Sequence, residues 1–228
     1  EIEGIDQLAL ENHVKEPVEQ LTHEAMSTTG LNADLYAQRL GLVQPSNKQT
    51  EHLANTYFSH LSPDTQTVIN VLHALNKAVY VISAGNNPAV TLFAQKLKIN
   101  KQNTFAVDLF FDEDGNYNHF DHQSPMVNAF GKNKVLKEIQ KKHPRVIHIG
   151  DGINDIETQD HVTRFIGYGG HFFRQSIADQ CSIYIKSKSL LPVLPLTLTQ
   201  AEMVSLNTEH QETVRRATGM LNDHVLMS

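Results

Sequence analysis

The chain has 228 residues and a formal charge of −6, and 40% of its residues are hydrophobic and 19% charged. This balance is that of an ordinary globular protein, and the absence of a basic block argues against nucleic acid as a partner. The single cysteine, Cys181, excludes an internal disulfide framework and fits a reducing compartment. No apolar run approaches a membrane span, so we expect no membrane partner and a cytoplasmic location.

Residues 1–60 carry helical patterns and no strand pattern. Asn32 is placed to cap one helix, and Ser46 with Gln49 has the spacing of a capping box before another. The region therefore reads as a small unit of four short helices. Ser62 is predicted to cap a longer helix that has Pro63 in its first turn.

From Ala78 onward, strand patterns alternate with helical ones. The predicted strands are 79–82, 104–107, 146–149, 164–168 and 182–185, with a hairpin over 109–120 that turns at Asp114-Gly115. The predicted helices between them follow Asn87-Pro88, span 132–142 and lie near Gln175. Strands that alternate with helices indicate an α/β fold with a parallel sheet and right-handed crossovers.

Residues 190–228 differ from the preceding part. Two prolines, Pro192 and Pro195, precede a polar stretch from Gln200 to Leu226 that is expected to be helical. Five apolar residues form a stripe along it, and such a stripe more often docks within its own chain than forms a dimer seam, although a homodimer remains an alternative. These residues are Leu206, Val214, Ala217, Met220 and Leu221.

The stretch from Arg145 to Glu157 reads R-V-I-H-I-G-D-G-I-N-D-I-E. Its apolar, β-branched start predicts a buried strand that stops in a tight turn at Asp151. A helix that begins there would put Asp151 and Asp155 on one face, and two carboxylates past the carboxyl end of a strand suit Mg²⁺. The alternative is that Asp-Gly closes a loop and Asp155 caps a helix.

Two further residues stand where a phosphate could bind. Ser83 is expected just past a strand, with Ala84 and Gly85 beside it and a helix start ahead. Lys132 follows Gly131 at a helix start, where a cation opposes the helix dipole and so hints at an anionic ligand. The alternatives are an ordinary turn at Ser83 and an exposed lysine on a lysine-rich helix.

Arg39 and Glu3 complete the candidate residues. Arg39 lies on an amphipathic helix, and its planar guanidinium suits a carboxylate, although a surface arginine is the alternative. Glu3 taken alone is an acidic residue near a helix start. Other signals point away from function: His119 and His122 have no partners at zinc spacing and are predicted to lie on the surface, and Cys181 has no nucleophile context.

The motifs, taken in order, resemble those of the phosphoserine phosphatase family in the haloacid dehalogenase superfamily. The matching segments are E-G-I-D-Q-L-A at 3–9, L-G-L-V-Q-P-S at 40–46, V-I-S-A-G at 81–85, G-K-N-K-V at 131–135, I-G-D-G-I-N-D at 149–155 and F-I-G-Y-G-G at 165–170. The resemblance covers about residues 1–186. It implies a doubly wound parallel, Rossmann-like sheet core with a small helical cap.

The resemblance also implies roles for the candidate residues. Ser83, with Ala84 and Gly85, would hydrogen-bond the transferring phosphoryl group, Lys132 would neutralise it, and Asn154 would lie near it. Asp151 and Asp155 would hold Mg²⁺. Glu3 would pair with the ammonium group and Arg39 with the carboxylate of phosphoserine. The implied reaction is hydrolysis of O-phospho-L-serine to serine and phosphate through an aspartyl-phosphate, a step of serine biosynthesis.

The chain departs from this family at the first motif, Asp-x-Asp-x-Ser/Thr, which should end a few residues before Glu3. We therefore expect the two catalytic aspartates to lie upstream of residue 1, and the 228 residues alone to be inactive. Smaller departures put the substrate in question: Ala84 replaces a glycine, Asn86 and Asn87 replace an aromatic and a basic residue, and Asn32 stands where the cap usually offers an aromatic side chain.

The sequence thus predicts three parts: a helical cap over 1–60, an α/β core over 61–189 and a C-terminal extension over 190–228. Two alternatives to a phosphoserine phosphatase remain. One is a phosphatase or phosphotransferase for another small phosphorylated metabolite, and the other is an inactive relative that binds an anion or a partner.

Overall fold

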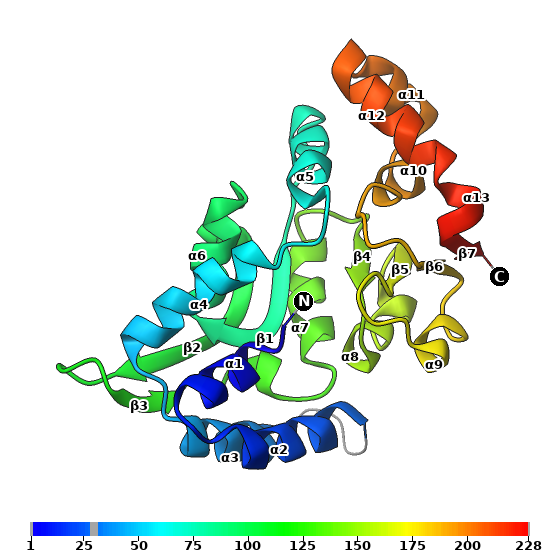
Figure 1. Ribbon diagram of the computed structural model, residues 1–228. Coiled ribbons are helices and arrows are strands. Elements are labelled where there is room, and N and C mark those ends of the chain that lie inside the picture. Colours follow the sequence, from blue (N-terminus) through cyan, green and yellow to red (C-terminus); the bar gives the residue numbers. More distant parts are fainter. Residues whose placement is uncertain (1, 28–31, 228) are drawn as a thin grey trace. The chain divides into compact units, whose positions relative to one another are not determined.

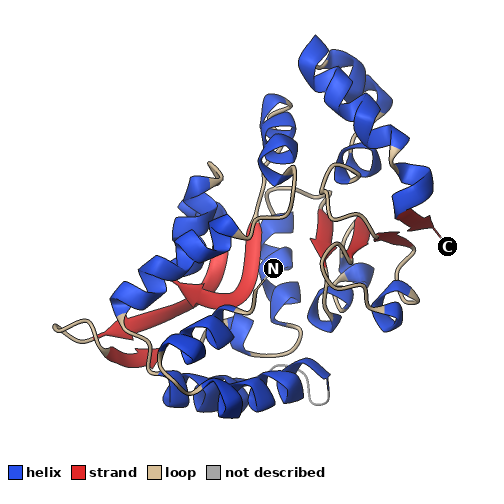
Figure 2. Ribbon diagram, in the orientation of Figure 1, coloured by secondary structure: helices blue, strands red, loops and turns tan. Residues whose placement is uncertain are grey.

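The computed structural model describes residues 2–27 and 32–227 (Figure 1). Strands and helices alternate between residues 81 and 185, as expected for an α/β protein, and runs of helices lie on either side of this part of the chain (Figure 2). The α-helices are α1 (Gly4–Glu11), α2 (Lys15–Ser27), α3 (Ala33–Val43), α4 (Asn47–Ser59), α5 (Thr65–Ala74), α6 (Ala89–Lys96), α7 (Gly131–Gln140), α8 (Ile153–Ile156), α9 (Gln175–Ala178), α10 (Val193–Thr197), α11 (Gln200–Ser205), α12 (Thr208–Gly219) and α13 (Leu221–His224). The strands are β1 (Val81–Asn87), β2 (Thr104–Phe111), β3 (Tyr117–Phe120), β4 (Ile147–Gly150), β5 (Arg164–Tyr168), β6 (Ile183–Ile185) and β7 (Val225–Met227).

The chain divides into two compact units. The first contains Glu1–His60 and Tyr80–Lys142, and the second contains Leu61–Val79 and His143–Ser228. Each unit is therefore built from two separate stretches of sequence. These units do not correspond one to one with the three parts predicted from the sequence, and that division remains a proposal. No described helix is long and apolar enough to cross a membrane.

The first unit contains a three-stranded sheet in the order β1-β2-β3. Strands β1 and β2 are parallel, and β2 and β3 form the predicted antiparallel hairpin. Helix α6 packs on β1 and β2, and α4 packs on α6. The four predicted helices of residues 1–60 are confirmed as α1 to α4, as are the Asn32 cap of α3 and the Ser46–Gln49 capping box of α4.

The second unit contains a four-stranded sheet in the order β4-β5-β6-β7. Strands β4, β5 and β6 are parallel, and β7 adds to β6 in the antiparallel direction. The strand predicted at 164–168 is confirmed with those bounds as β5. The α/β prediction is therefore confirmed, with an antiparallel strand, β3 or β7, at one end of each sheet.

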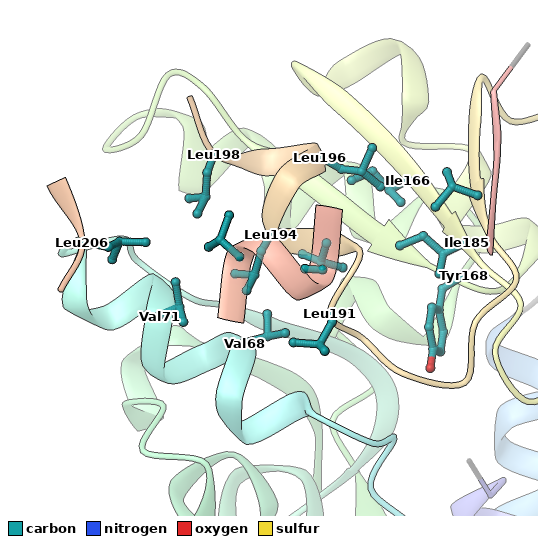
Figure 3. Close-up of a cluster of buried hydrophobic side chains, with 14 residues drawn as sticks. Val68, Val71, Ile166, Tyr168, Ile185, Leu191, Leu194, Leu196, Leu198 and Leu206 are labelled. Atoms are coloured by element: carbon teal, nitrogen blue, oxygen red, sulfur yellow. The ribbon is translucent and has the colours of Figure 1, made fainter. Parts of the chain in front are cut away.

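The C-terminal region helps to form the core of the second unit. Side chains from α10, α12 and β7 pack with Val68 and Val71 of α5 and with Ile166 and Ile185 of the sheet (Figure 3). Leu206, Val214 and Ala217 of the predicted stripe are buried in this core, and Met220 and Leu221 are partly buried against it. The prediction that the stripe docks within the chain is therefore confirmed.

Three local predictions were wrong. Helix α5 begins at Thr65 with no side-chain cap, because the residue before it, Asp64, lies in the left-handed region (φ 64°), and the Ser62 carbonyl oxygen instead accepts from Thr65 Oγ1 at 2.7 Å. Strand β1 begins at Val81 and continues past Ser83 to Asn87. The end of the polar C-terminal stretch forms β7 rather than helix, because its backbone pairs with the edge of β6.

Candidate active site

Ser83 lies within a bulge of β1 rather than just past the strand. The β1–β2 register pairs Ile82 with Phe105 and resumes at Asn86 with Val107, so that Ser83, Ala84 and Gly85 lie in the irregular segment between these two pairs. The Gly85 N–H donates to Ser83 Oγ at 2.9 Å, which closes a local turn. Bulges of this kind re-aim side chains and often lie next to active sites.

Tyr36 joins the helical part of the first unit to this bulge. Its hydroxyl contacts the Ala84 carbonyl oxygen at 3.1 Å and also donates to Asn86 Oδ1. Tyr36 and Asn86 are 4% exposed, and burial raises the pKa of the Tyr36 hydroxyl above its usual value. The phenol therefore stays neutral and holds α3 to the backbone beside Ser83.

Arg39 lies one turn further along α3 and is 7% exposed. Its guanidinium lies over the Tyr36 ring, 5.7 Å from the ring centre, and its Nε has no hydrogen-bond partner among the described residues. Burial lowers the pKa of Arg39, whereas Tyr36, Glu3 and Asp6 act in the opposite direction. A buried cation with an open donor can receive a carboxylate.

Glu3 and the start of α1 lie close to the same bulge. A Cβ atom on Gly4 would be 1.8 Å from the Tyr57 hydroxyl oxygen, and one on Gly85 would be 3.6 Å from that oxygen. Burial raises the pKa of Tyr57, and the charge of Glu3 raises it further. The first unit thus brings Glu3, Arg39 and the Ser83 bulge together around Tyr36 and Tyr57.

Lys132 lies in the first turn of α7, as predicted, and is half-buried. The short helix η2 (Pro125–Val127) contacts β1 and the start of α7. A Cβ atom on Gly131 would be 1.9 Å from the Pro125 carbonyl oxygen, so only glycine permits this approach. Ser83 and Lys132 therefore lie on elements that share η2 as a neighbour.

Asp151 follows β4 in a turn, two residues before α8 begins. The prediction of a single helix carrying Asp151 and Asp155 on one face was therefore wrong, because Gly152 is extended (φ −121°, ψ 171°) and delays the helix. The Asp151 side chain is 55% exposed, and Arg174 Nη1 donates to its Oδ2 at 3.3 Å and to its backbone carbonyl at 2.9 Å.

Asp155 is 5% exposed and packs over the end of β4. Its Oδ1 lies 2.9 Å from His148 Nε2, and the Gly152 N–H donates to its Oδ2 at 3.3 Å. The latter bond shows that Asp155 does cap the start of α8, the alternative considered from sequence. A Cβ atom on Gly150 would be 2.1 Å from Asp155 Cγ, so glycine at 150 makes room for this carboxylate.

Asp151 and Asp155 offer the type of donor atom that a magnesium ion binds. Both offer carboxylate oxygens, and such an oxygen can accept a hydrogen bond and also bind a cation. Among the described residues no three His, Cys, Asp or Glu side chains gather as a metal set. Two protein carboxylates suit Mg²⁺, which usually keeps water or substrate oxygen in its remaining positions.

The residues that hold the predicted site residues in place were not predicted from the sequence. Tyr36, His148 and Thr158 contact Ala84 or Asp155, yet none lies in a recognisable spacing. A polar His148 inside a buried apolar strand was the one available signal. Cys181 is buried, whereas His119 and His122 are exposed, as predicted. The convergence of Ser83 and Lys132, in the first unit, with Asp151, in the second, stays a prediction.

Comparison with known sequences agrees with the motif order. The family model of haloacid dehalogenase-like hydrolases matches residues 7–158. Phosphoserine phosphatase of Bos taurus is 35% identical over 185 residues, which are 80% of this chain and 82% of that protein. The chloroplastic phosphoserine phosphatase of Arabidopsis thaliana is 31% identical over 194 residues, 83% of this chain and 66% of that protein.

Solved structures show the same fold at lower identity. A phosphoserine phosphohydrolase-like protein from Francisella tularensis superposes with a TM-score of 0.74 at 20% identity and covers 86% of this chain and 93% of its own. A substrate-bound phosphoserine phosphatase complex gives a TM-score of 0.71 at 22% identity, with 85% and 90% covered. These likenesses support the Rossmann-like α/β core expected from the sequence.

Proposed function

The chain belongs to the haloacid dehalogenase-like hydrolases, and from this premise we propose that it is a Mg²⁺-dependent phosphomonoester hydrolase of the phosphoserine phosphatase type. The proposed substrate is O-phospho-L-serine, and the proposed location is the cytoplasm. The observation that carries the proposal is the grouping of Glu3 and Arg39 around the serine-bearing bulge of β1. Such a site matches an amino acid that also carries a phosphate.

The phosphoryl end of the substrate is assigned to Ser83, Lys132 and Asn154. The Ser83 hydroxyl and the irregular backbone of Ala84 and Gly85 offer hydrogen-bond groups, and the Lys132 ammonium offsets negative charge. Asn154 would contribute its side-chain N–H groups, which can donate to phosphate oxygens. Fixed donors aimed at the charged oxygens supply most of the catalysis in phosphoryl transfer.

The amino-acid end is assigned to Arg39 and Glu3. The open Nε and low exposure of Arg39 favour a carboxylate partner, which would also compensate the buried charge. Glu3 is exposed at the start of α1 and can accept from an ammonium group. This pair would distinguish phosphoserine from phosphate esters that lack one of the two charges.

The cation is assigned to Asp151 and Asp155. When bound, Mg²⁺ would neutralise negative charge on the phosphate oxygens. The chain contributes an exposed carboxylate in the turn and a buried carboxylate held at the start of α8. The 228 residues contain no Asp-x-Asp-x-Ser/Thr segment, and the group that attacks phosphorus is therefore not assigned to a residue.

The proposal is tested by phosphate release from a panel of esters with the full-length protein and Mg²⁺. The panel contains O-phospho-L-serine, O-phospho-L-threonine, phosphoethanolamine and glycerol phosphate. We expect kcat/KM for phosphoserine to exceed that for phosphoethanolamine by about 10-fold or more, because the latter leaves the buried Arg39 unpaired. Equal or higher activity on glycerol phosphate would contradict the substrate assignment.

A matched pair of lysine variants tests the phosphate site. Lys132→Met should lower kcat/KM about 10²- to 10³-fold, as removal of an electrostatic donor does elsewhere. Lys134→Met changes an exposed residue on the same helix and should leave it unchanged. Binding of phosphoserine by the parent protein without any release of phosphate would instead favour an anion-binding relative.

A further inference from the structure

A buried histidine contacts the carboxylate assigned to the cation. His148 comes from β4, is 8% exposed, and places Nε2 at 2.9 Å from Asp155 Oδ1. An ionised carboxylate only accepts hydrogen bonds, so this contact is attractive when Nε2 carries a proton. The phosphate, amino-acid and cation sites proposed above assign no role to His148.

The far side of the His148 ring is also fixed. Thr158 is 0% exposed, and its Oγ1 donates to the Asp155 carbonyl oxygen at 2.7 Å. The same oxygen lies 2.9 Å from His148 Nδ1 and can accept from it. The Phe165 ring meets the imidazole edge-to-face, with ring centres 5.8 Å apart. Rotation of the imidazole would therefore lose contacts on both nitrogens and against Phe165.

His148, Thr158 and Asp155 of α8 form a closed ring of polar contacts. Asp155 is held at Oδ1 by His148, at Oδ2 by the Gly152 N–H and at its carbonyl by Thr158. A carboxylate has about four acceptor positions, so its oxygens can bind a cation while Oδ1 keeps its contact with the histidine. These contacts thus fix the direction in which the Asp155 carboxylate oxygens point.

We propose that His148, held in place by Thr158, is a positioning residue that aims the Asp155 carboxylate at the divalent cation. The inference rests on the proposed function, because it takes Asp155 as a ligand of that cation. Hydrogen-bond partners behind metal ligands set the orientation of those ligands, and their loss typically weakens metal affinity by about 10- to 100-fold. The proposal concerns orientation and does not depend on a change in protonation.

The test measures cation affinity directly, without turnover. Mn²⁺ accepts the same oxygen ligands as Mg²⁺, and its unbound fraction is read from the electron paramagnetic resonance signal during titration of the full-length protein. His148→Met fills the space without a donor and should weaken the Kd for Mn²⁺ about 10- to 100-fold. His148→Gln restores an N–H near the position of Nε2 and should recover most of the affinity.

Three variants serve as controls. Thr158→Val removes the contacts to His148 Nδ1 and to the Asp155 carbonyl oxygen but leaves the His148–Asp155 contact, and it should give an intermediate loss of affinity. His161→Met changes an exposed histidine of the same unit and should give none. Asp151→Asn should abolish tight Mn²⁺ binding. An unchanged Kd in His148→Met, beside a weakened Kd in Asp151→Asn, would overturn the positioning role and leave the proposed function standing.

Failure of the proposed function has a different signature. If Asp151→Asn and Asp155→Asn both bind Mn²⁺ as the parent does, the cation assignment is wrong and the inference falls with it. A second measurement uses only the parent protein and so does not depend on whether a variant folds. The ¹⁵N signal of His148 Nε2 should shift when Mg²⁺ is added. The absence of a shift at saturating Mg²⁺ would contradict the proposal.

Discussion

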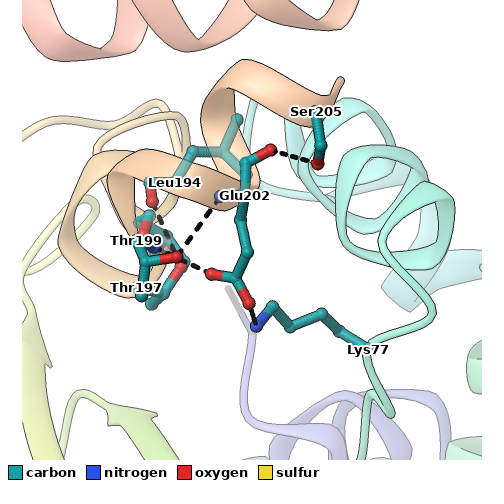
Figure 4. Close-up of polar contacts among 7 residues, drawn as sticks. Lys77, Leu194, Thr197, Thr199, Glu202 and Ser205 are labelled. Carbon is teal, nitrogen blue, oxygen red and sulfur yellow. Dashed lines mark hydrogen bonds and ion pairs between the residues drawn. The ribbon is translucent and has the colours of Figure 1, made fainter. Parts of the chain in front are cut away.

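Lys77 and Glu202 form an ion pair between the segment after α5 and the helix α11 (Figure 4). The Glu202 carboxylate also accepts from the Thr199 backbone N–H at 2.8 Å, and Thr199 Oγ1 accepts in return from the Glu202 N–H at 3.3 Å. This capping box starts α11. One carboxylate therefore both caps α11 and joins the C-terminal region to the chain before β1.

The ion pair predicts a stability difference that depends on pH. The Lys77 ammonium, followed by the Thr199 N–H, lowers the pKa of Glu202 to about 2. A lowered folded-state pKa stabilises the fold above the unfolded pKa near 4.5, and the stabilisation disappears as the pH falls toward 2. Because both side chains are about one-third exposed, Glu202→Gln should cost only about 1 kcal/mol at pH 7.

Urea unfolding of the parent and Glu202→Gln between pH 7 and pH 2 measures this difference. The two curves should converge at the acid end, provided that both proteins still unfold cooperatively there. Glu113→Gln changes an exposed glutamate in the turn of the β2–β3 hairpin; it is the control and should follow the parent throughout. A difference that stays constant to pH 2 would argue against the Glu202 interaction as its source.

Truncation of a core residue in the C-terminal region should destabilise the protein strongly. Leu194 is 0% exposed within the cluster that includes Val68 and Val71, and Leu194→Ala should cost about 2–5 kcal/mol. Val204→Ala, in the same region but 64% exposed, should change stability by less than about 0.5 kcal/mol. Chemical denaturation measures both, and equal effects would contradict the packing of this region.

The two glycines around Asp151 should respond differently to alanine. A Cβ atom at Gly150 would lie 2.1 Å from Asp155 Cγ, so Gly150→Ala should displace that carboxylate and cost about 1–3 kcal/mol or more. A Cβ atom at Gly152 would meet Asp155 Oδ2 only at an ordinary 3.6 Å, so Gly152→Ala should be tolerated. Thermal unfolding and Mg²⁺ titration compare the pair, and a tolerated Gly150→Ala would refute the close approach.

Arg39 provides a test of substrate recognition. Arg39→Met keeps most of the buried aliphatic length and removes the cation, and should raise KM for phosphoserine by about 10-fold or more. The same variant should leave the kinetics of phosphoethanolamine, which has no carboxylate, nearly unchanged. Equal losses on both substrates would assign Arg39 to support of the fold. Arg215→Met, on the exposed face of α12, is the control.

The parts of the fold that could be predicted from the sequence are those set by residues close together in the chain. Four features that depend on near neighbours were predicted correctly: the strand at 164–168, the hairpin over 109–120 and the caps at Asn32 and Ser46. The start of α5 and strand β7 were not, because each depends on distant contacts. Ser189 Oγ donates to Asp64 at 2.6 Å, and β7 exists only through its pairing with β6.

The residues of the candidate site divide in the same way. A motif can mark the ends and irregularities of helices and strands, and the predicted residues Ser83, Lys132, Asp151 and Asp155 lie there. The side chains that hold this part of the structure in place come from elsewhere in the chain, as Tyr36 does for Ala84. No spacing predicts such contacts, because they depend on how a helix packs against a strand.

The division of the second unit's core between α5 and the C-terminal region has a consequence for biosynthesis. Val68 and Val71 leave the ribosome long before Leu194, Val214 and Ala217, which complete their packing. Throughout that interval the apolar face of α5 lacks its final cover and is open to association with other nascent chains. Messages that end early, within residues 190–227, should therefore yield products that aggregate or require chaperones.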